Sequence, residues 1–437
     1  LWGPGTLALI LGTGAWLTLR TGGFPQRNLG RALTLSLGRE ARRKGRGGVS
    51  PFGSLMTALA STVGTGNIVG VAAALVSGGP GALVWMELAA LLGLASKFAE
   101  CMLAVKYRHV RRDGTRWGGP MAVMETRLGS AGAVLGRFYA LFALLMAFAM
   151  GAMAQSGALA DTFFAAFTLP RWRVGLVTAV LALAILLGGI RRIAEISTVL
   201  VPVMALLYLG GGLAVILGNL RRLPEALILM LRCAVAPEAA LGGALGIVTR
   251  REALRWGVAR SVFSNEAGLG SASITAACAD TEDPVKQGLI SMTGVFFDTM
   301  VICTVTGLAI CCSGTLGAAD GNGLPLTGAA LTLRAFETVL GPLAPWLIGA
   351  ALGLFAFTSV LGCAVQAETT ASYLLGPEAV RPCRVLYGLA VFVGAVIPMA
   401  TVLQLADLAN ALMAFSNLVC LLLLSGEIAG ECGRKER

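Results

Sequence analysis

The sequence Val63-Gly64-Thr65-Gly66-Asn67 interrupts an apolar segment, residues 55–78, that is long enough to cross a lipid bilayer. A second apolar segment, residues 258–279, is interrupted in the same way by Asn265-Glu266-Ala267-Gly268-Leu269-Gly270-Ser271. Glycine allows the backbone to leave the helix, and a polar side chain at membrane depth needs a partner. The two stretches therefore predict two membrane helices that are broken near their middles.

The composition of the whole chain indicates a membrane protein. Of its 437 residues, 56% are hydrophobic and 13% are charged, whereas a soluble domain carries about 25% charged residues. This balance excludes a soluble enzyme, a disordered scaffold and a nucleic-acid-binding protein. The 58 glycines fit the same class, because small residues allow membrane helices to pack closely. We therefore expect an all-α polytopic protein in a lipid bilayer.

Apolar stretches of bilayer length predict about eleven transmembrane helices. The two interrupted spans are the second and the seventh, so each of them begins a group of five. This order predicts an inverted five-plus-five repeat with one additional helix before it, and in such transporters the broken helices hold the substrate and ion site. The predicted spans are 3–19, 55–78, 82–105, 136–164, 173–190, 193–218, 258–279, 287–313, 343–374, 384–399 and 401–425.

The distribution of basic residues predicts the orientation of these spans. If the loops alternate between the two faces, 24 Lys and Arg residues fall on one face and 10 on the other. The positive-inside rule makes the more basic face cytoplasmic. The N-terminus is then outside and the C-terminus inside, in the plasma membrane of a prokaryotic cell. Arg250, Arg251, Arg255 and Arg260 fall outside in this arrangement, in or beside a long loop whose residues 241–256 could form an interfacial helix.

The same reasoning divides the chain into six parts. We predict a peripheral helix at 1–20, a basic cytoplasmic loop at 21–54 that includes Lys44 and Arg46, the first repeat at 55–218, an extracellular loop at 219–257, the second repeat at 258–425 and a cytoplasmic tail at 426–437.

The two interruptions are the first candidates for ligand contact. Gly64, Gly66 and Gly70 resemble a dinucleotide fingerprint, but that motif needs a strand before it and both flanks here belong to one apolar segment. Close helix packing is one interpretation of these glycines, and an unwound helix that exposes its backbone to a ligand is the other. Asn67 favours the second interpretation. Glu266 is a carboxylate at membrane depth, which indicates a functional site, although it can also pair with an arginine or cap a half-helix.

Other polar side chains within the spans extend this set. Gln155 lies in the middle of the fourth span. Thr358 and Ser359 offer adjacent hydroxyl oxygens, which hard cations prefer, although hydroxyls in helices commonly bond back to their own backbone. Asp298 and Asp407 can serve as ion ligands, proton sites or structural pairs, and the sequence does not choose among these roles.

Enzymatic chemistry is disfavoured. The single histidine, His109, stands among arginines in a loop, so a histidine-based metal site or a catalytic triad is not expected. The ten cysteines contain no CxxC pair, and most of them lie in apolar runs where a thiol acts as a small hydrophobic group. An intramembrane hydrolase would need an activated nucleophile, and no base for one is evident.

Several motifs together resemble the alanine/glycine:cation symporter family. The similar stretches cover nearly the whole chain and include Thr62 to Ala72, Gly78-Gly79-Pro80-Gly81-Ala82, Lys97-Phe98-Ala99-Glu100, Asp113-Gly114, Gly118-Gly119-Pro120-Met121, Phe263 to Ala272, Pro284 to Leu289 and Val295 to Thr299. The resemblance implies a fold of the amino-acid–polyamine–cation type and Na⁺- or H⁺-coupled uptake of a small neutral amino acid.

The resemblance also implies site residues, carried over by motif. The substrate site maps to Thr65, Gly66, Asn67, Gln155, Phe263, Ser264 and Gly268, together with position 363. A Na⁺ site would use the carbonyl groups of Ala60 and Val63 with the hydroxyls of Thr358 and Ser359.

This chain departs from the family at the substrate pocket. Where the family usually has Trp-Ser-Tyr-Tyr-Gly-Glu, the chain has Cys363-Ala364-Val365-Gln366-Ala367-Glu368. After Met121, the usual Tyr-Tyr is Ala122-Val123. Replacing Trp by Cys363 removes a large ring, so a substrate larger than alanine, or a polar one that reaches Gln366, is expected.

We therefore expect a Na⁺-coupled amino-acid symporter that works by alternating access, not an enzyme. Coupling to H⁺ through Glu266 or Asp298 is the alternative within transport. A transporter-like receptor, which binds an amino acid without moving it, is the alternative outside transport.

Overall fold

The computed structural model describes residues 3–43, 49–110, 114–235, 238–240, 247–319 and 323–436. Within these residues, helices lie at all eleven ranges predicted as spans. Seven helices, or eight if one bent pair is taken as a single span, are long and apolar enough to cross a membrane. The other three predicted spans correspond to α1 (Pro4–Arg20), α9 (Arg171–Leu186) and the pair α12 (Arg250–Asn265) and α13 (Ser271–Ala277). The first two have 17 and 16 residues, and α12 begins with charged side chains.

The helices of the first predicted repeat are interrupted at two places. Its first member is broken between α4 and α5, and its third member contains a π-helical stretch, η3. The elements are α4 (Pro51–Thr62), η2 (Gly66–Gly70), α5 (Val71–Gly78), α6 (Gly81–Lys106), α7 (Pro120–Met146), η3 (Ala147–Ala154), α8 (Gln155–Phe167), α9 and α10 (Gly189–Gly218).

The second predicted repeat also begins with a broken helix, but its π-helical stretch lies in a different member. Its first member is the broken pair α12 and α13, and its second contains the π-helical stretch η5. The further elements are α14 (Pro284–Val295), η5 (Phe296–Cys303), α15 (Thr304–Ser313), η6 (Gly341–Leu343), α17 (Ala344–Leu375), η7 (Pro377–Ala379), α18 (Val380–Val396) and α19 (Met399–Leu423).

Two boundaries differ from the sequence prediction for local reasons. The helix α4 begins at Pro51, four residues before the predicted span, because the Ser50 hydroxyl accepts a hydrogen bond from the Gly53 N–H at 3.0 Å and caps the helix. The span predicted at 136–164 begins earlier, at Pro120. A kink at Gly129, whose φ is +62°, separates this amphipathic first part from the apolar remainder.

The connecting segments contain structure that the sequence prediction left as loops. The basic loop at 21–54 and the tail at 426–437 are partly helical, and the loop at 219–257 holds a helix before its strands. The elements are α2 (Phe24–Arg27), α3 (Leu29–Leu37), η1 (Arg39–Arg42), β1 (His109–Val110), β2 (Arg116–Trp117), η4 (Leu220–Arg222), α11 (Leu223–Val235), β3 (Glu238–Ala240), β4 (Ile247–Thr249), α16 (Gly328–Leu340) and α20 (Ser425–Glu436). Lys44, Arg46, Asp113, Arg437 and residues 241–246 of the predicted interfacial helix lie outside the described residues.

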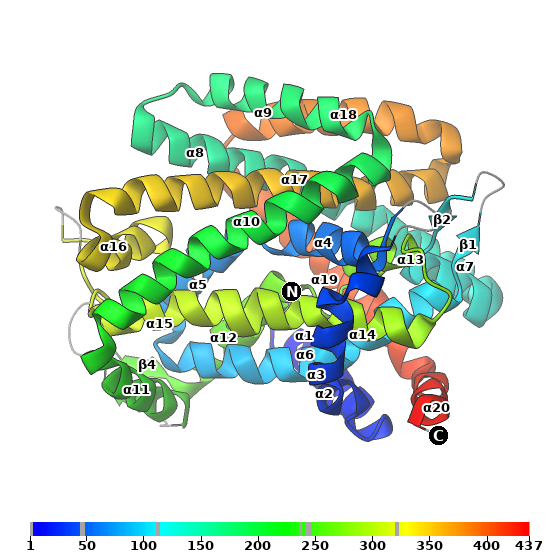
Figure 1. Ribbon diagram of the computed structural model, residues 1–437, viewed down its shortest axis with the longest axis horizontal. Helices are drawn as coiled ribbons and strands as arrows, with labels where there is room; N and C mark the ends of the chain where they lie inside the picture. Colours follow the sequence, from blue (N-terminus) through cyan, green and yellow to red (C-terminus); the bar gives the residue numbers. More distant parts are fainter. Residues whose placement is uncertain are drawn as a thin grey trace.

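Corresponding helices of the two repeats pack on one another. The helix α6 lies against α14, α9 lies against α18, and α17 lies along α8 and η3. Figure 1 shows α9 and α18 side by side along one edge of the molecule, while α6 and α14 run along the opposite side. This exchange of equivalent contacts is what an inverted five-plus-five repeat produces.

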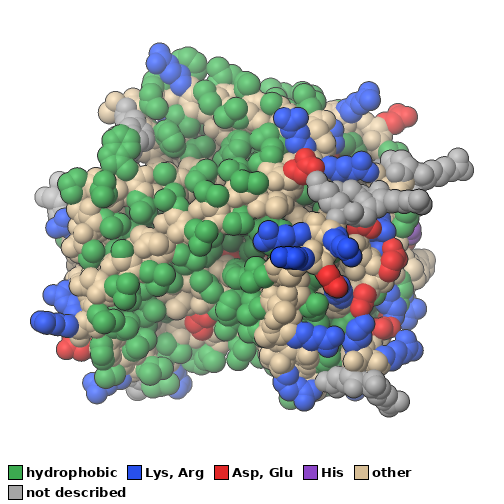
Figure 2. All heavy atoms as spheres, in the orientation of Figure 1, with side chains coloured by type: hydrophobic (Ala, Val, Ile, Leu, Met, Phe, Trp, Pro, Cys, Tyr) green, Lys and Arg blue, Asp and Glu red, His purple; other side chains and the backbone are tan. Residues whose placement is uncertain are grey.

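The outer surface has the pattern of a bilayer-embedded protein. Figure 2 shows hydrophobic side chains across the middle of the molecule, with Lys, Arg, Asp and Glu gathered toward the end that carries β1, β2 and α20. Large apolar side chains on α10, such as Leu206 (72%) and Leu217 (66%), are exposed. A lipid tail can cover such a surface without cost, whereas water cannot.

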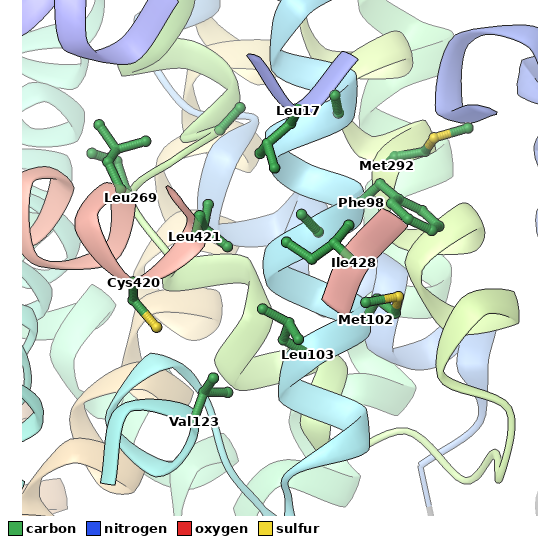
Figure 3. Close-up of a cluster of buried hydrophobic side chains, with 14 of the residues drawn as sticks. Leu17, Phe98, Met102, Leu103, Val123, Leu269, Met292, Cys420, Leu421 and Ile428 are labelled. Carbon is green, nitrogen blue, oxygen red and sulfur yellow. The ribbon is translucent and has the colours of Figure 1, made fainter. Parts of the chain in front are cut away.

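The interior is held by apolar side chains from both ends of the chain. In Figure 3, Phe98 and Met102 of α6 lie beside Ile428 of α20, and Leu269 lies beside Leu421 of α19. Leu269 belongs to the interruption between α12 and α13. The core therefore anchors this interruption directly against α19.

The helix α20 is tied to the end of α6 by a group of ionic contacts around Glu427. Its carboxylate accepts from Lys106 Nζ at 2.6 Å, from Arg127 Nε at 3.1 Å and from the Tyr107 hydroxyl. Burial acts to raise the pKa of Glu427, but the hydrogen bonds from Lys106 and Tyr107 outweigh it, so the pKa lies below the ordinary value.

This cluster predicts an acid-sensitive contact. A lowered folded-state pKa means that Glu427 stabilises the fold fully above about pH 4.3 and loses that contribution as the pH falls through the folded value. We expect Glu427→Gln to remove about 1 kcal/mol of stability at pH 7 and to make the thermal midpoint less dependent on pH between about 5 and 3. Glu337→Gln, which removes an exposed pair with Arg334 (3.3 Å), is the control. Equal pH profiles for wild type and Glu427→Gln would contradict this role.

Candidate functional site

The first interruption leaves backbone donors without partners. The helix α4 ends at Thr62, and the chain bends by 54° before it continues as η2 and α5. The Asn67 side chain accepts a hydrogen bond from the Gly64 N–H at 3.2 Å. Among the described residues, no hydrogen bond uses the N–H of Thr65 or Gly66. These two donors lie at the N-terminal end of a half-helix, where anions are favoured.

The second interruption is held open by a carboxylate from another helix. Glu266, Gly268 and Gly270 all have φ between +53° and +89°, so the backbone leaves the helix at each of them. The Glu100 Oε2 on α6 accepts from the N–H groups of Gly268 (3.2 Å) and Gly270 (3.1 Å) and from Asn417 Nδ2 (3.0 Å). Glu100 therefore fixes the shape of this interruption.

Asp298 connects the two interruptions. Its carboxylate accepts from Asn67 Nδ2 at 2.7 Å, from Ser264 Oγ at 2.5 Å and from Thr299 Oγ1 at 3.1 Å. Asn67 belongs to the first interruption and Ser264 to the helix that precedes the second. Asp298, Asn67 and Ser264 are all fully buried. A single carboxylate thus couples the positions of the two broken helices.

Gln155 reaches the first interruption from the junction of η3 and α8. The Thr65 hydroxyl donates to Gln155 Oε1 at 3.2 Å. A Cβ atom added at Gly64 would lie 3.3 Å from Gln155 Nε2 and 2.9 Å from Ser359 Oγ. Glycine at position 64 is therefore needed for these side chains to approach the backbone. Thr65, Gly66 and Phe263 are partly exposed, whereas Gly64 is buried.

The residues expected to bind a cation lie where α17 crosses α4. The Ser359 hydroxyl is 3.4 Å from the Val63 carbonyl oxygen. Gly362 allows the close crossing, since a Cβ there would lie 2.9 Å from the Ala60 carbonyl carbon. The Thr358 hydroxyl instead bonds to the Leu354 carbonyl of its own helix at 2.9 Å. Val63, Ser359 and Ala60 are thus brought together, and Thr358 would have to give up a local bond to join them.

Cys363 is buried against η3. A Cβ added at Gly151 would lie 2.9 Å from Cys363 Sγ and equally close to the Tyr387 hydroxyl. One turn along α17, both amide atoms of Gln366 are buried and have no hydrogen-bond partner among the described residues.

Two further carboxylates were candidates in the sequence. Glu266 accepts a hydrogen bond from the Ser271 hydroxyl, and Asp407 is partly exposed on α19.

Two positioning residues, Glu100 and Asn417, were missed as site residues in the sequence. The motif Lys97-Phe98-Ala99-Glu100 places two opposite charges three residues apart in an apolar span, and in the structure they lie 3.5 Å apart and fully buried. Such a pair was the available signal for Glu100. Asn417 gave no comparable signal, because a single amide in a long apolar helix does not point to its partner.

Comparisons with known proteins identify the family of the chain and proteins that share its fold. The model of a family described as the sodium:alanine symporter family matches residues 1–433. The chain is 41% identical over 432 residues to the sodium/alanine symporter AgcS of Methanococcus maripaludis, which covers 98% of this chain and 94% of the relative. It is 37% identical over 430 residues to the probable sodium/glutamine symporter GlnT of Bacillus subtilis, covering 97% and 86%. The crystal structure of MhsT in complex with L-phenylalanine matches with a TM-score of 0.60 at 14% identity, over 85% of this chain and 88% of that one, and shares its fold.

Proposed function

This chain belongs to the sodium:alanine symporter family, and we propose that it couples inward flow of Na⁺ to uptake of a small neutral amino acid. It is a secondary transporter and not an enzyme. The observation that carries the proposal is the junction of two broken helices at Asp298, where the first interruption also has the free N–H groups of Thr65 and Gly66.

The two interruptions offer opposite charges to an amino-acid zwitterion. The N–H groups of Thr65 and Gly66 suit the carboxylate, and the carbonyl end of α12 near Phe263 and Ser264 suits the ammonium group. The remaining proposed substrate contacts are Asn67, Gln155, Gly268 and Cys363.

The proposed Na⁺ site lies between α4 and α17. The carbonyl oxygens of Ala60 and Val63 and the hydroxyls of Thr358 and Ser359 form an oxygen set suited to a hard cation. A cation there would hold the two helices together beside the substrate. Na⁺ and the amino acid then raise each other's affinity by the same factor, and the coupled pair moves by alternating access. The positive-inside count supports an outside N-terminus and a cytoplasmic C-terminus.

The substrate is proposed to be larger or more polar than alanine. The small Cys363 replaces the ring usual in the family, and the unpartnered amide of Gln366 lies one turn away. One relative is named for alanine and another for glutamine. Competition of labelled L-alanine uptake by L-glutamine tests this, and competition by alanine and glycine alone would contradict it.

Uptake into proteoliposomes tests the function itself. An inward Na⁺ gradient is compared with an equal K⁺ gradient at fixed pH, with labelled L-alanine and labelled L-glutamine as the two substrates. Accumulation that requires Na⁺ supports the symporter. Uptake that follows a pH gradient instead would assign coupling to H⁺, and saturable binding without flux would indicate a receptor.

Ser359→Ala tests the proposed cation site. Loss of one hydroxyl ligand is expected to raise the Na⁺ concentration for half-maximal uptake by about 5- to 30-fold, corresponding to roughly 1–2 kcal/mol. The maximal rate at saturating Na⁺ should change less. Thr369→Ala, which removes a hydroxyl bonded to its own helix at 2.8 Å, is the matched control on α17. An unchanged Na⁺ dependence in Ser359→Ala would refute the assignment.

A further inference from the structure

An arginine lies flat against the first interruption. Arg260 is on α12, one turn before Phe263, and its guanidinium group covers Gly66 and Gly70. A Cβ added at Gly66 would overlap the guanidinium group, and one added at Gly70 would lie 2.6 Å from Arg260 Nε. These two glycines, four residues apart in one turn, form the surface on which the guanidinium rests.

This guanidinium has no anion beside it among the described residues. No carboxylate there forms an ion pair with Arg260, and its Nε is buried without a hydrogen-bond partner. Asp298 is close enough to interact with it electrostatically. The Asp298 oxygens, however, already accept hydrogen bonds from Asn67 and Ser264. A partly buried cation at membrane depth is costly unless an anion compensates it.

The guanidinium also lies on the accessible side of the interruption. Thr65, Gly66 and Gly70 are partly exposed, as is Arg260, whereas Asn67 and Ile68 are fully buried. The forked donors of Arg260 therefore lie beside Gly66, in the same turn that carries the free N–H groups of Thr65 and Gly66. A planar carboxylate accepts two parallel N–H donors from such a fork.

We propose that Arg260 pairs with the α-carboxylate of the transported amino acid and selects for substrates that carry one. This inference rests on the proposed function, because it names the charged partner at the same site. The carboxylate accepts from the backbone at Thr65 and Gly66 on one side and from the guanidinium on the other. The glycines at 66 and 70 are required because any side chain there would displace Arg260.

Binding of L-alanine and L-alaninamide in the presence of Na⁺ tests the pairing, since the amide lacks the carboxylate. In Arg260→Gln, the Kd for L-alanine is expected to rise by about 10- to 100-fold. The Kd for L-alaninamide should change by less than about threefold, so the discrimination between the two compounds falls. Arg260→Lys keeps the charge without the fork and should restore part of the discrimination. Arg255→Gln, on the exposed side of the same helix beside Trp256, is the control.

Gly70→Ala tests the same pairing without removing Arg260. The added methyl group displaces the guanidinium, so discrimination should fall as in Arg260→Gln. Gly210→Ala is its control, because a Cβ at Gly210 meets no atom within 4 Å.

If Arg260→Gln weakens the binding of both compounds equally, or only lowers the thermal midpoint, Arg260 is structural and the inference is wrong. If binding discriminates between L-alanine and L-alaninamide as expected but uptake does not depend on Na⁺, the proposed coupling is contradicted and the pairing is not. A wild type that binds neither compound would overturn both.

Discussion

Asp298→Ala is expected to reduce amino-acid uptake at least 100-fold. Removing this carboxylate leaves the hydroxyls of Ser264 and Thr299 without this acceptor in a fully buried site. It also removes the shortest hydrogen bond of Asn67 Nδ2, which keeps the Asp298 backbone carbonyl at 3.2 Å. Each buried donor left unpaired costs about 1–3 kcal/mol. The two interruptions would then no longer be held at one spacing, and a substrate that touches both would lose its complementary site.

Asp298→Asn separates geometry from charge in this prediction. The amide has the same shape but keeps only one acceptor oxygen, so it cannot accept from both Asn67 and Ser264 as the carboxylate does. We expect uptake between the wild-type and Asp298→Ala values, with a smaller fall in the thermal midpoint. Asp407→Asn, on the partly exposed face of α19, is the control.

The measurements are initial uptake rates at saturating Na⁺ and thermal unfolding in detergent. Near-normal uptake by Asp298→Ala would show that the connection between the interruptions is not required for transport. If Asp298→Asn retains Na⁺-driven uptake but loses a dependence on pH, Asp298 is a proton site in addition to a structural one.

The membrane helices and the two interruptions were predictable because their signals are local. A run of apolar residues marks a span wherever it lies in the chain, and Gly64, Gly66, Gly268 and Gly270 mark the points where a span breaks. The fold class and the family were confirmed. The helices α11, α16 and α20 were missed because they are too short or too polar to cross a bilayer, and their amphipathic faces are stabilised by packing on the spans.

The partners within the site were less predictable because they are far apart in sequence. Asn67 was singled out as a polar residue at membrane depth, but its bond to Asp298 joins positions 231 residues apart. Asp298 itself was left among three roles, and in the structure its carboxylate accepts hydrogen bonds from Asn67 and Ser264. The proposed Na⁺ ligands and substrate contacts stay predictions, although Val63 and Ser359 do meet.

Glu100→Ala is the second change for which we expect a large effect. Glu100 Oε2 accepts from two backbone N–H groups, at Gly268 and Gly270, and from Asn417. It is also the carboxylate beside Lys97 Nζ, at 3.5 Å, and both side chains are fully buried. Removing one member of a buried pair costs about 3–5 kcal/mol, because the remaining charge is left uncompensated. We expect a strong fall in folded protein and no measurable uptake.

The double variant Lys97→Met with Glu100→Gln tests whether the charge or the shape matters more. Removing both charges relieves the penalty of a lone buried ion, so the double variant should be more stable than the two single changes predict by addition. The amide introduced by Glu100→Gln keeps one oxygen for Gly268 and Gly270, and some uptake should return. Additive losses in the thermal midpoint would contradict a coupled pair. Glu125→Gln, which removes an exposed carboxylate charge beside the Tyr373 hydroxyl, is the control.

The expected failure of Glu100→Ala follows from the backbone it supports. Gly268 and Gly270 have positive φ, so their N–H groups point away from the helix and cannot be satisfied by it. In a membrane interior water is not available to replace the lost acceptor, and each such N–H must find a partner within the protein. Without Glu100, the segment can satisfy these donors only by rewinding toward a continuous helix, and a continuous helix has no free ends to offer a zwitterion. Restored thermal stability without restored uptake, in any variant at position 100, would be the signature of that rewinding.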